Sequence, residues 1–244
     1  MDLNGKVALV TGAARRVGQA IAFALAQRGA TVAVHHRMSG NEANATVAQI
    51  RAAGGKAWPY MADLQHVVQI EAMIGHIEKD LGRLDILVNS ASIFYRKAIA
   101  EVTEQDWDAN LDINLKAPFF LAKSASAIMR RNGAGKIVNI GDWAGIRPYN
   151  NYLPYTVSKA GLIGLTKALA KALAPEVQVN CLALGPVLPP EGYDEAEVQR
   201  LARFTLTGRL GTPQDVVEGV LFFCEGSDFA TGSTLVLDGG RLIK

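Results

Sequence analysis

The chain of 244 residues has only two cysteines and four histidines. Cys181 and Cys224 have no paired or metal-like spacing, so the sequence predicts two reduced thiols in the core rather than a disulfide framework. The histidines lack cysteine or carboxylate companions at ligand spacing. We therefore expect no metal site.

An excess of one charge and a long apolar run are also missing. Lys and Arg number 25 against 23 Asp and Glu, a formal net charge of +2, which gives no reason to expect nucleic acid or an anionic membrane as partner. No apolar stretch is long enough to span a bilayer, and the short apolar run Lys6–Val10 does not resemble a signal peptide. These features predict a cytoplasmic protein.

Short β-rich runs alternate with helical patterns along the whole chain. The runs are Lys6–Val10, Thr31–His35, Lys56–Tyr60, Leu84–Val88, Lys136–Ile140, Val177–Leu182 and Thr234–Leu237. Such alternation predicts an α/β fold with a mostly parallel sheet covered on both faces, in one domain spanning 1–244. The leucines of one helical pattern, Leu162, Leu165, Leu169 and Leu173, are expected to face the sheet.

One irregular stretch, Gly185–Gly192 with three prolines, precedes a charged helical pattern at Tyr193–Arg203. A long connection without a strand is often a binding loop or lid, and a simple surface crossover remains an equal alternative. We assign a candidate substrate loop to about 185–208.

The turn Thr11–Gly18 lies between the first strand and the first helix, where doubly wound folds bind a dinucleotide pyrophosphate. Gly12 and Gly18 allow close approach of the backbone, and the helix N-terminus favours anionic phosphate. At the end of the second strand, His36 and Arg37 stand where an acidic residue would bind the ribose of NAD. The arginine favours NADP(H).

Two polar side chains at the start of a helical pattern predict a reactive group. Tyr155 and Lys159 are four residues apart and therefore share a helix face. A neighbouring ammonium favours the phenolate, so this lysine is expected to lower the pKa of the tyrosine. An amphipathic turn with a half-buried tyrosine is the alternative interpretation.

Taken together, these motifs resemble the short-chain dehydrogenase/reductase family over essentially the whole chain. The resemblance is carried by Thr11–Gly18, Asn89-Ser90-Ala91, Asn114, Asn139–Asp142, Tyr155 with Lys159, Val179-Asn180, Gly185-Pro186 and Leu237–Gly240. It implies a doubly wound Rossmann domain with a seven-stranded parallel sheet, a nicotinamide cofactor and a homotetramer. It also implies cofactor contacts from Gly12, Arg15, Arg16, Val17, Gly18, His36, Arg37, Asp63, Leu64, Asn89, Ser90, Ala91, Tyr155, Lys159, Gly185, Pro186 and Val187. Asp63 has an alternative role as a helix cap.

The departures from the family pattern concern the expected active site. Arg16 replaces the usual middle glycine of the first turn, and Asp142 stands 13 residues before Tyr155, where the family has its catalytic serine. Together with the stretch Asn89–Tyr95, these residues resemble the pteridine reductase branch of the family. That resemblance implies reduction of a pterin, dihydropterin or dihydrofolate ring by NADPH.

A pterin is a flat bicycle with polar groups on its rim, so it requires an aromatic plate and hydrogen bonds. Phe94 is expected to supply the plate, with Ser92 and Arg16 bonding the rim or cofactor phosphate. Asp142 and Tyr155 are expected to deliver the proton to a ring nitrogen.

The remaining expected roles support that proton-delivery pair. Lys159 would bind the nicotinamide ribose, and Asn114 would hold a water behind it. Each role has a purely structural alternative: Phe94 as a core residue, Asp142 as a strand-end cap, and Asn114 as a residue that only braces a helix.

Two other functions stay open on the sequence. A carbonyl reductase of the 3-oxoacyl (acyl carrier protein) type would use the same cofactor, although Asp142 and Phe94 are unfavourable for it. A catalytically silent NADP-binding protein is the other, and the retention of Tyr155, Lys159 and Asn114 argues against it.

Overall fold

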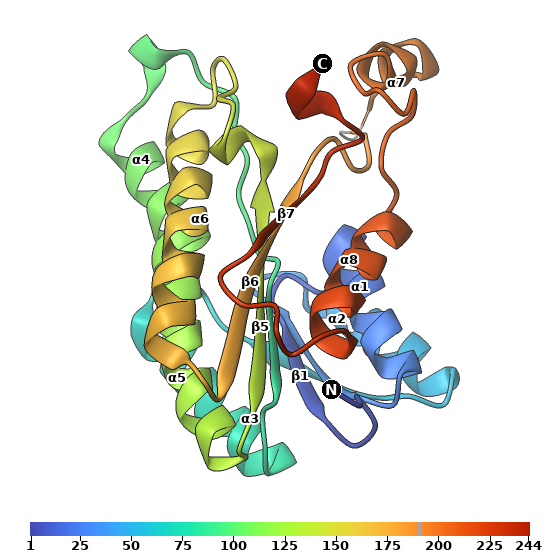
Figure 1. Ribbon diagram of the computed structural model, residues 1–244, viewed down its shortest axis with the longest axis vertical. Helices are drawn as coiled ribbons and strands as arrows, with labels where there is room; N and C mark the ends of the chain where they lie inside the picture. The colour runs from blue at the N-terminus through green and yellow to red at the C-terminus, as the bar shows by residue number, and fades with distance from the viewer. Residues whose placement is uncertain (190–191) are drawn as a thin grey trace.

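Seven short strands form one parallel sheet in the computed structural model, which describes residues 1–189 and 192–244 (Figure 1). The strands are β1 (Val7–Val10), β2 (Thr31–His36), β3 (Lys56–Met61), β4 (Ile86–Asn89), β5 (Gly135–Asp142), β6 (Val177–Leu184) and β7 (Thr234–Leu237). Their order across the sheet is β3-β2-β1-β4-β5-β6-β7. Strands β1 and β4 are apolar and fully buried, as a sheet covered on both faces requires. The predicted α/β sheet is confirmed.

The strand order reverses between β1 and β4, and this position determines where a ligand can bind. From β1 the chain first builds outward to β2 and β3, then crosses to β4 and continues outward to β7. The loops that leave β1 and β4 therefore diverge, and in open parallel sheets the resulting crevice at the carboxyl ends of the strands holds the ligand.

Helices cover both faces of the sheet (Figure 1). One layer contains α1 (Arg16–Gln27), α2 (Gly40–Ala52) and α8 (Pro213–Glu225), and the other contains α3 (Val67–Leu81), α4 (Glu104–Leu111), α5 (Ala117–Arg131) and α6 (Leu153–Leu173). Helix α7 (Glu195–Ala202) lies with the C-terminus at the end of the sheet where β6 finishes. Short turns of helix are η1 (Ile99–Glu101), η2 (Asp112–Lys116), η3 (Trp143–Gly145) and η4 (Arg241–Ile243), of which η2 is a π-helical turn.

The two faces of the sheet have separate apolar cores. Helix α1 buries Ile21 and Leu25 against one face, and α6 buries Leu162, Leu169 and Leu173 on the other side of the molecule. Leu165 is partly buried against the same core. Each fully buried leucine contributes about 2 kcal/mol to stability, so both layers hold the strands firmly in place. The predicted helix leucines are confirmed as sheet-facing.

The segment that follows β6 contains the predicted charged helix. This is α7, which is shorter than the sequence pattern at both ends and begins after Asp194. Asp194 and Glu197 bond each other's main-chain N–H groups at 2.8 and 2.9 Å, a capping box that sets where the helix starts. Pro190 and Glu191, inside the candidate substrate loop, lie outside the described residues.

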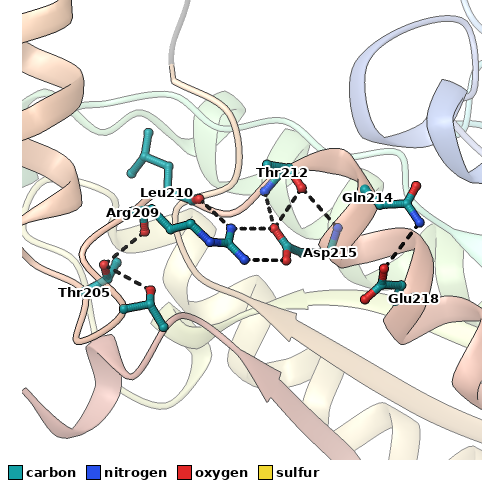
Figure 2. A network of polar contacts seen from close by, with 8 residues as sticks. Thr205, Arg209, Leu210, Thr212, Gln214, Asp215 and Glu218 are labelled. Carbon is teal, nitrogen blue, oxygen red and sulfur yellow. Dashed lines mark hydrogen bonds and ion pairs between the residues drawn. The ribbon is translucent and has the colours of Figure 1, made fainter.

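A polar network fixes the far end of this segment to α8 (Figure 2). Arg209 donates two hydrogen bonds of 2.7 Å to the carboxylate of Asp215. Thr212 bonds the same carboxylate and caps α8, while the Thr205 hydroxyl donates to the carbonyl of Arg209 at 3.0 Å. The hydrogen bond from Arg209 lowers the pKa of Asp215, which therefore stays ionised at the start of the helix.

The described part of the chain lacks a membrane-spanning helix and a cluster of metal ligands. Among residues 1–189 and 192–244, no helix is both long and apolar enough to cross a bilayer. Within the same ranges, no group of three or more His, Cys, Asp or Glu side chains is arranged to hold a metal ion.

Candidate active site

A cavity of about 760 Å³ opens at the carboxyl ends of the strands, at the reversal of strand order. The predicted site residues that line it are Gly12, Arg15, Arg16, Val17, Gly18, His36, Arg37, Asp63, Leu64, Ser90, Ala91, Ser92, Phe94, Asp142, Tyr155, Lys159, Gly185 and Val187. Asn89, Asn114 and Pro186 do not line it. Asn89 is buried, and its amide donates to Asn139 Oδ1 at 2.8 Å. Most of the predicted site thus lies around one cavity.

The first turn is packed so tightly that two of its positions require glycine. A Cβ on Gly18 would lie 2.4 Å from the Gly12 carbonyl oxygen, and one on Gly12 would lie 3.0 Å from the Cα atom of Ala91. Gly12 also has a φ of 64°, in the left-handed region that side chains disfavour. The turn therefore presents bare backbone to the cavity, as a pyrophosphate site needs.

His35 supports this turn, and the sequence patterns did not identify it as a site residue. Its Nδ1 accepts from the Gly12 N–H at 3.0 Å, and its Nε2 lies 3.0 Å from the Ala62 carbonyl oxygen. The first contact needs a bare ring nitrogen and the second an N–H, so the ring is neutral with its proton on Nε2. Burial lowers the pKa of His35 to about 4, which agrees with a neutral ring. The one signal in the sequence for this role is the position of His35 at the end of the second predicted strand, next to the first turn.

Thr11 connects the turn to the loop after β4. Its hydroxyl accepts from the N–H groups of Ser90 and Ala91 at 2.9 and 3.0 Å, and it lies 3.4 Å from the Val88 carbonyl. One side chain therefore sets the spacing between the two loops that border the crevice. Ser90 and Ala91 belong to the predicted cofactor contacts, and Thr11 orients them.

Arg16 occupies an unfavourable backbone conformation at the place where the family pattern has glycine. Its φ is 55°, which costs about 1–2 kcal/mol in a residue with a side chain. The guanidinium Nη2 donates to the Pro189 carbonyl oxygen at 3.3 Å. The side chain thus reaches from the first turn to the segment after β6, on the other side of the crevice.

The end of β2 forms the second part of the predicted cofactor site. Arg37 Nη1 lies 4.0 Å from Asp63 Oδ2, and His36 Nδ1 is buried without a hydrogen-bond partner among the described residues. Asp63 Oδ1 also accepts from the Gln65 N–H at 3.1 Å, so the carboxylate orders the turn before α3. The exposed guanidinium, held only by this long ion pair, and the unsatisfied imidazole nitrogen are the polar groups that this end offers to a ligand.

Asp142 and Tyr155 meet at the opposite end of the cavity. Asp142 ends β5 and Tyr155 lies in the first turn of α6, and the Tyr155 hydroxyl donates to Asp142 Oδ2 at 2.8 Å. Asp142 Oδ1 accepts from the Ala144 N–H at 2.7 Å. Burial raises the pKa of Asp142, and burial together with the Asp142 charge raises the pKa of Tyr155. The aspartate also caps η3, so the strand-end cap and the predicted contact with Tyr155 both occur.

Lys159 stands behind this pair in a buried position. Its ammonium donates to the Ile140 carbonyl at 2.9 Å and lies 5.6 Å from the centre of the Tyr155 ring. The sequence pattern predicted that Lys159 lowers the pKa of Tyr155, whereas the pKa of Tyr155 is raised because burial and Asp142 act on it more strongly. The lysine charge instead lowers the pKa of Asp142, against the larger effect of burial.

Asn114 holds the loop after β4 against α6. Its Oδ1 accepts from the Ser92 hydroxyl and the Ile93 N–H at 3.1 and 3.0 Å, and its amide donates to the Ile93 carbonyl and to Ser158 Oγ at 3.1 Å each. All four hydrogen-bonding positions of the side chain are therefore filled. A relay water would need the main-chain carbonyl of Asn114, which lies in the π-helical turn η2.

An aromatic group forms the wall beside Tyr155. Phe94 stacks on Tyr152 with ring centres 4.2 Å apart and planes 7° from parallel, and it meets Tyr155 edge-on at 4.6 Å. The side chain of Phe94 is 47% exposed, so it is not the core phenylalanine of the alternative interpretation. Tyr149 adjoins the group, 6.1 Å from Phe94, and bonds Trp143 Nε1.

Comparison with known proteins gives a consistent result. The family model described as short chain dehydrogenase matches residues 6–197. The 3-oxoacyl-(acyl-carrier-protein) reductase of Thermotoga maritima is 35% identical over 248 residues, covering 100% of both chains. A dehydrogenase/reductase from Sinorhizobium meliloti 1021 is 37% identical with a TM-score of 0.91, covering 98% of this chain and 97% of that one. A short chain dehydrogenase from Burkholderia cenocepacia J2315, solved in complex with NADP, is 34% identical with a TM-score of 0.91, covering 99% of each.

The names of these relatives bear on the two enzymatic expectations. None of the three is named as a pteridine reductase, and one carries the name of the 3-oxoacyl alternative. Family membership rests on the matched model and on identities above 30% over nearly complete chains, and these criteria agree with the seven-stranded sheet and its cavity. The chain belongs to the short-chain dehydrogenase family.

Proposed function

We propose that this protein is an NADPH-dependent reductase of a ring C=N bond in a pterin, dihydropterin or dihydrofolate. The observation that carries the proposal is the 2.8 Å hydrogen bond from the Tyr155 hydroxyl to Asp142 Oδ2. In the family pattern a serine hydroxyl stands beside the tyrosine and polarises a carbonyl oxygen. A carboxyl group in that place suits a nitrogen that must be protonated.

The cavity has the features that NADP(H) requires. The first turn offers bare backbone at Gly12 and Gly18, and the β2 end offers the Arg37 guanidinium and the unsatisfied His36 nitrogen for a 2′-phosphate. No carboxylate follows β2 directly to bind a free ribose 2′-hydroxyl. The bound dinucleotide would supply hydride to the substrate. NADP bound to the Burkholderia relative supports the same choice here.

The protein's part of the chemistry is delivery of one proton. Because burial favours the neutral form of both groups, the Asp142–Tyr155 pair retains its protons more readily than exposed side chains would. Tyr155 donates its hydroxyl proton to the substrate nitrogen, and a protonated Asp142 resupplies it through their hydrogen bond. The adjacent ring carbon receives the hydride, so the product gains one hydride and one proton, which together amount to two electrons and two protons. Lys159 offers its ammonium to the nicotinamide ribose.

The aromatic wall supports a flat substrate. The ring of Phe94 lines the cavity, is 47% exposed and is held by its parallel stack on Tyr152 at 4.2 Å, which supports its role as a plate for a flat substrate. Ser92 and Arg16 stand near enough to the cavity to bond polar groups on the rim. We also propose that the segment 185–208 forms the outer wall of the substrate slot, since Val187 lines the cavity and Arg16 reaches Pro189.

A second candidate is reduction of a 3-oxoacyl thioester. The names of the relatives favour it over a pterin, because 3-oxoacyl reductases at 34–35% identity cover nearly the whole chain. Tyr155 alone would then protonate the carbonyl oxygen. Against it stands Asp142, because a carboxyl group replaces the serine hydroxyl that polarises the carbonyl oxygen in the family pattern.

One experiment separates these functions. NADPH oxidation is followed with dihydrobiopterin, dihydrofolate and an acetoacetyl thioester, using the wild type and the Asp142→Asn and Asp142→Ser variants. We expect the wild type to prefer a pterin and Asp142→Ser to shift the preference toward the thioester. A wild type that reduces the thioester faster than either pterin would establish the second candidate. Binding of NADPH without turnover of any substrate would indicate a silent NADP-binding protein.

We further propose that the protein forms a homotetramer. Among the described residues, strand β7 is an edge of the sheet and pairs with β6 alone; its Leu235 is exposed, as is Phe222 on the neighbouring α8. An open strand edge with apolar side chains is typical of a surface that another chain covers. Light scattering on a size-exclusion column measures the assembly, and a monomer at micromolar concentration would contradict this expectation.

A further inference from the structure

A second cavity, of about 280 Å³, lies next to the aromatic wall of the candidate active site. Its side chains come from the turn after β5, from the start of the segment after α7, and from the C-terminal turn η4 with the residue that follows it. The principal lining residues are Trp143, Arg147, Tyr149, Phe204, Arg241 and Lys244. Three of these six are cations, and no acidic side chain lines the cavity.

The three cations differ in how they are held. Arg241 stacks over the rings of Trp143 and Phe204, at 4.8 and 5.5 Å from their centres, so its guanidinium is fixed in place. The ammonium of Lys244 donates to the main-chain carbonyls of Arg203 and Thr205. The side chain of Arg147 is exposed and forms no hydrogen bond or ion pair with the described residues. Two guanidinium groups therefore remain without a carboxylate partner in the part of the chain that the structure describes.

Residues that line the second cavity adjoin residues that line the first. Trp143 follows Asp142 in the chain, and its indole N–H donates to the Tyr149 hydroxyl. Tyr149 in turn lies 6.1 Å from Phe94, the ring proposed to stack on the substrate. The charge of Arg241 lowers the pKa of Asp142, which means that this guanidinium is within electrostatic range of the reacting end. A substituent on a substrate at Phe94 would have to extend past Tyr149 to reach the cations.

We propose that this second cavity is a subsite for an anionic arm of the substrate, with Arg147 and Arg241 as its ligands. The assignment of the ring at Phe94 rests on the proposed function, whereas the subsite itself rests on the unpaired guanidinium groups. Guanidinium binds carboxylate and phosphate with two parallel hydrogen bonds, and the aromatic rings around it exclude water from part of the contact. A substrate with an anionic arm would be preferred over a neutral one.

Two kinds of substrate carry such an arm. A folate has carboxylates on its glutamyl tail, and an acyl thioester of a carrier protein has a phosphate on its pantetheine arm. Both present an anion at the end of a chain of several bonds. Separate binding measurements with p-aminobenzoylglutamate and 4′-phosphopantetheine, on the NADP-saturated protein, distinguish them.

Titration calorimetry provides a readout that does not depend on turnover. We expect at least one of these two fragments to bind, and Arg147→Gln or Arg241→Gln to weaken binding about tenfold or more, since each removes a charge-assisted contact. Arg130→Gln is the matched control, because Arg130 lies on α5 beside Glu176, away from both cavities. Failure of both fragments to bind, or equal affinity in Arg147→Gln and Arg130→Gln, would overturn the subsite.

Kinetics then separates the subsite from the proposed function. With the subsite present, the ratio of kcat/KM for dihydrofolate over dihydrobiopterin falls about tenfold in Arg147→Gln but not in Arg130→Gln. If both pterins are reduced and this ratio is unchanged, the reductase proposal stands and the subsite fails. If neither pterin is reduced while Arg147→Gln still weakens fragment binding, the subsite stands and the pterin assignment fails.

Discussion

The two ends of the cavity present different groups to a ligand: main-chain groups at one end and side chains at the other. At the first turn, main-chain groups face the ligand, and the side chains that matter, His35 and Thr11, are buried beneath them. At the other end, side chains face the ligand directly, in a hydrogen-bonded pair beside exposed aromatic rings. A phosphate chain is common to many cofactors and is served by backbone, whereas a particular substrate must be distinguished by side chains. The substitutions below are chosen to affect one end and leave the other intact.

The largest effect is expected from Tyr155→Phe. Removal of the hydroxyl eliminates the proton donor and should lower kcat at least about 100-fold, within the range that general acid catalysis contributes. The dissociation constant of NADPH, measured by fluorescence, should change less than about threefold, because the nucleotide end is untouched. A kcat near that of the wild type would remove Tyr155 from the proton-delivery role.

Next is the pH dependence of pterin reduction. Burial raises the pKa of Asp142, so its proton is present below that raised value and is lost above it. We expect kcat/KM to fall about tenfold per pH unit above this pKa, because only the protonated carboxyl resupplies Tyr155. The Asp142→Asn variant should have low activity without this descending limb. A wild-type profile without a descending limb, parallel to that of Asp142→Asn at every pH at which the protein stays folded, would argue against a role for a protonated Asp142.

His35 provides the corresponding test at the nucleotide end. Its folded-state pKa of about 4 lies below the ordinary value of 6.5, so the fold favours the neutral ring. The contribution of His35 to the free energy of unfolding is therefore complete above pH 6.5. It decreases as the pH falls toward 4, by up to about 3 kcal/mol. Urea unfolding at pH 7 and pH 4.5 measures the loss. We expect a smaller loss in His35→Gln, although that variant starts from a lower stability.

A smaller effect is expected for cofactor choice. Arg37→Gln removes the exposed guanidinium proposed to bind the 2′-phosphate and should raise KM for NADPH about tenfold, with KM for NADH changed little. Lys79→Gln on α3 is a control far from the cavity lining. Equal losses for NADPH and NADH would place the arginine in general nucleotide binding rather than in discrimination.

The smallest change concerns Arg16, which joins the two ends. Arg16→Gly relieves a left-handed backbone and should stabilise the fold by about 1 kcal/mol, less the loss of the contact with Pro189. The same variant should weaken NADPH and pterin alike, because the side chain lies between them. Comparison with Arg16→Ala, which keeps the strain and lacks the side chain, separates the two contributions in thermal unfolding.

Most of the fold follows from the sequence, and the reason is local. Periodicity and apolar runs place each strand within two residues, since they reflect which side chains face the sheet. Strands β5 and β6 extend two residues beyond the predicted ends, to Asp142 and Leu184, because Gly141 and Asp142 of β5 still pair with Ala183 and Leu184 of β6.

The site is predictable where one motif determines the geometry. Gly12, Gly18 and the Asp142–Tyr155 pair lie where expected. The support from His35 and the four hydrogen bonds of Asn114 were not anticipated, because both depend on which elements pack together in space. The predicted lowering of the Tyr155 pKa is wrong for the same reason, because helix spacing gives the distance to Lys159 but not the burial around the phenol.

Asn114 has a consequence for how the active site can move. Its amide group joins the Ser92–Ile93 backbone, which carries Phe94, to Ser158, which lies three residues beyond Tyr155 on the same helix. The hydrogen bonds of Asn114 therefore hold the loop that carries Phe94 and the helix that carries Tyr155 in one fixed arrangement. Lys159, proposed to bind the nicotinamide ribose, lies on the same helix directly after Ser158. Any motion of that helix would therefore carry Phe94, Tyr155 and Lys159 together, and the groups proposed for substrate stacking, proton delivery and ribose binding would keep their mutual spacing.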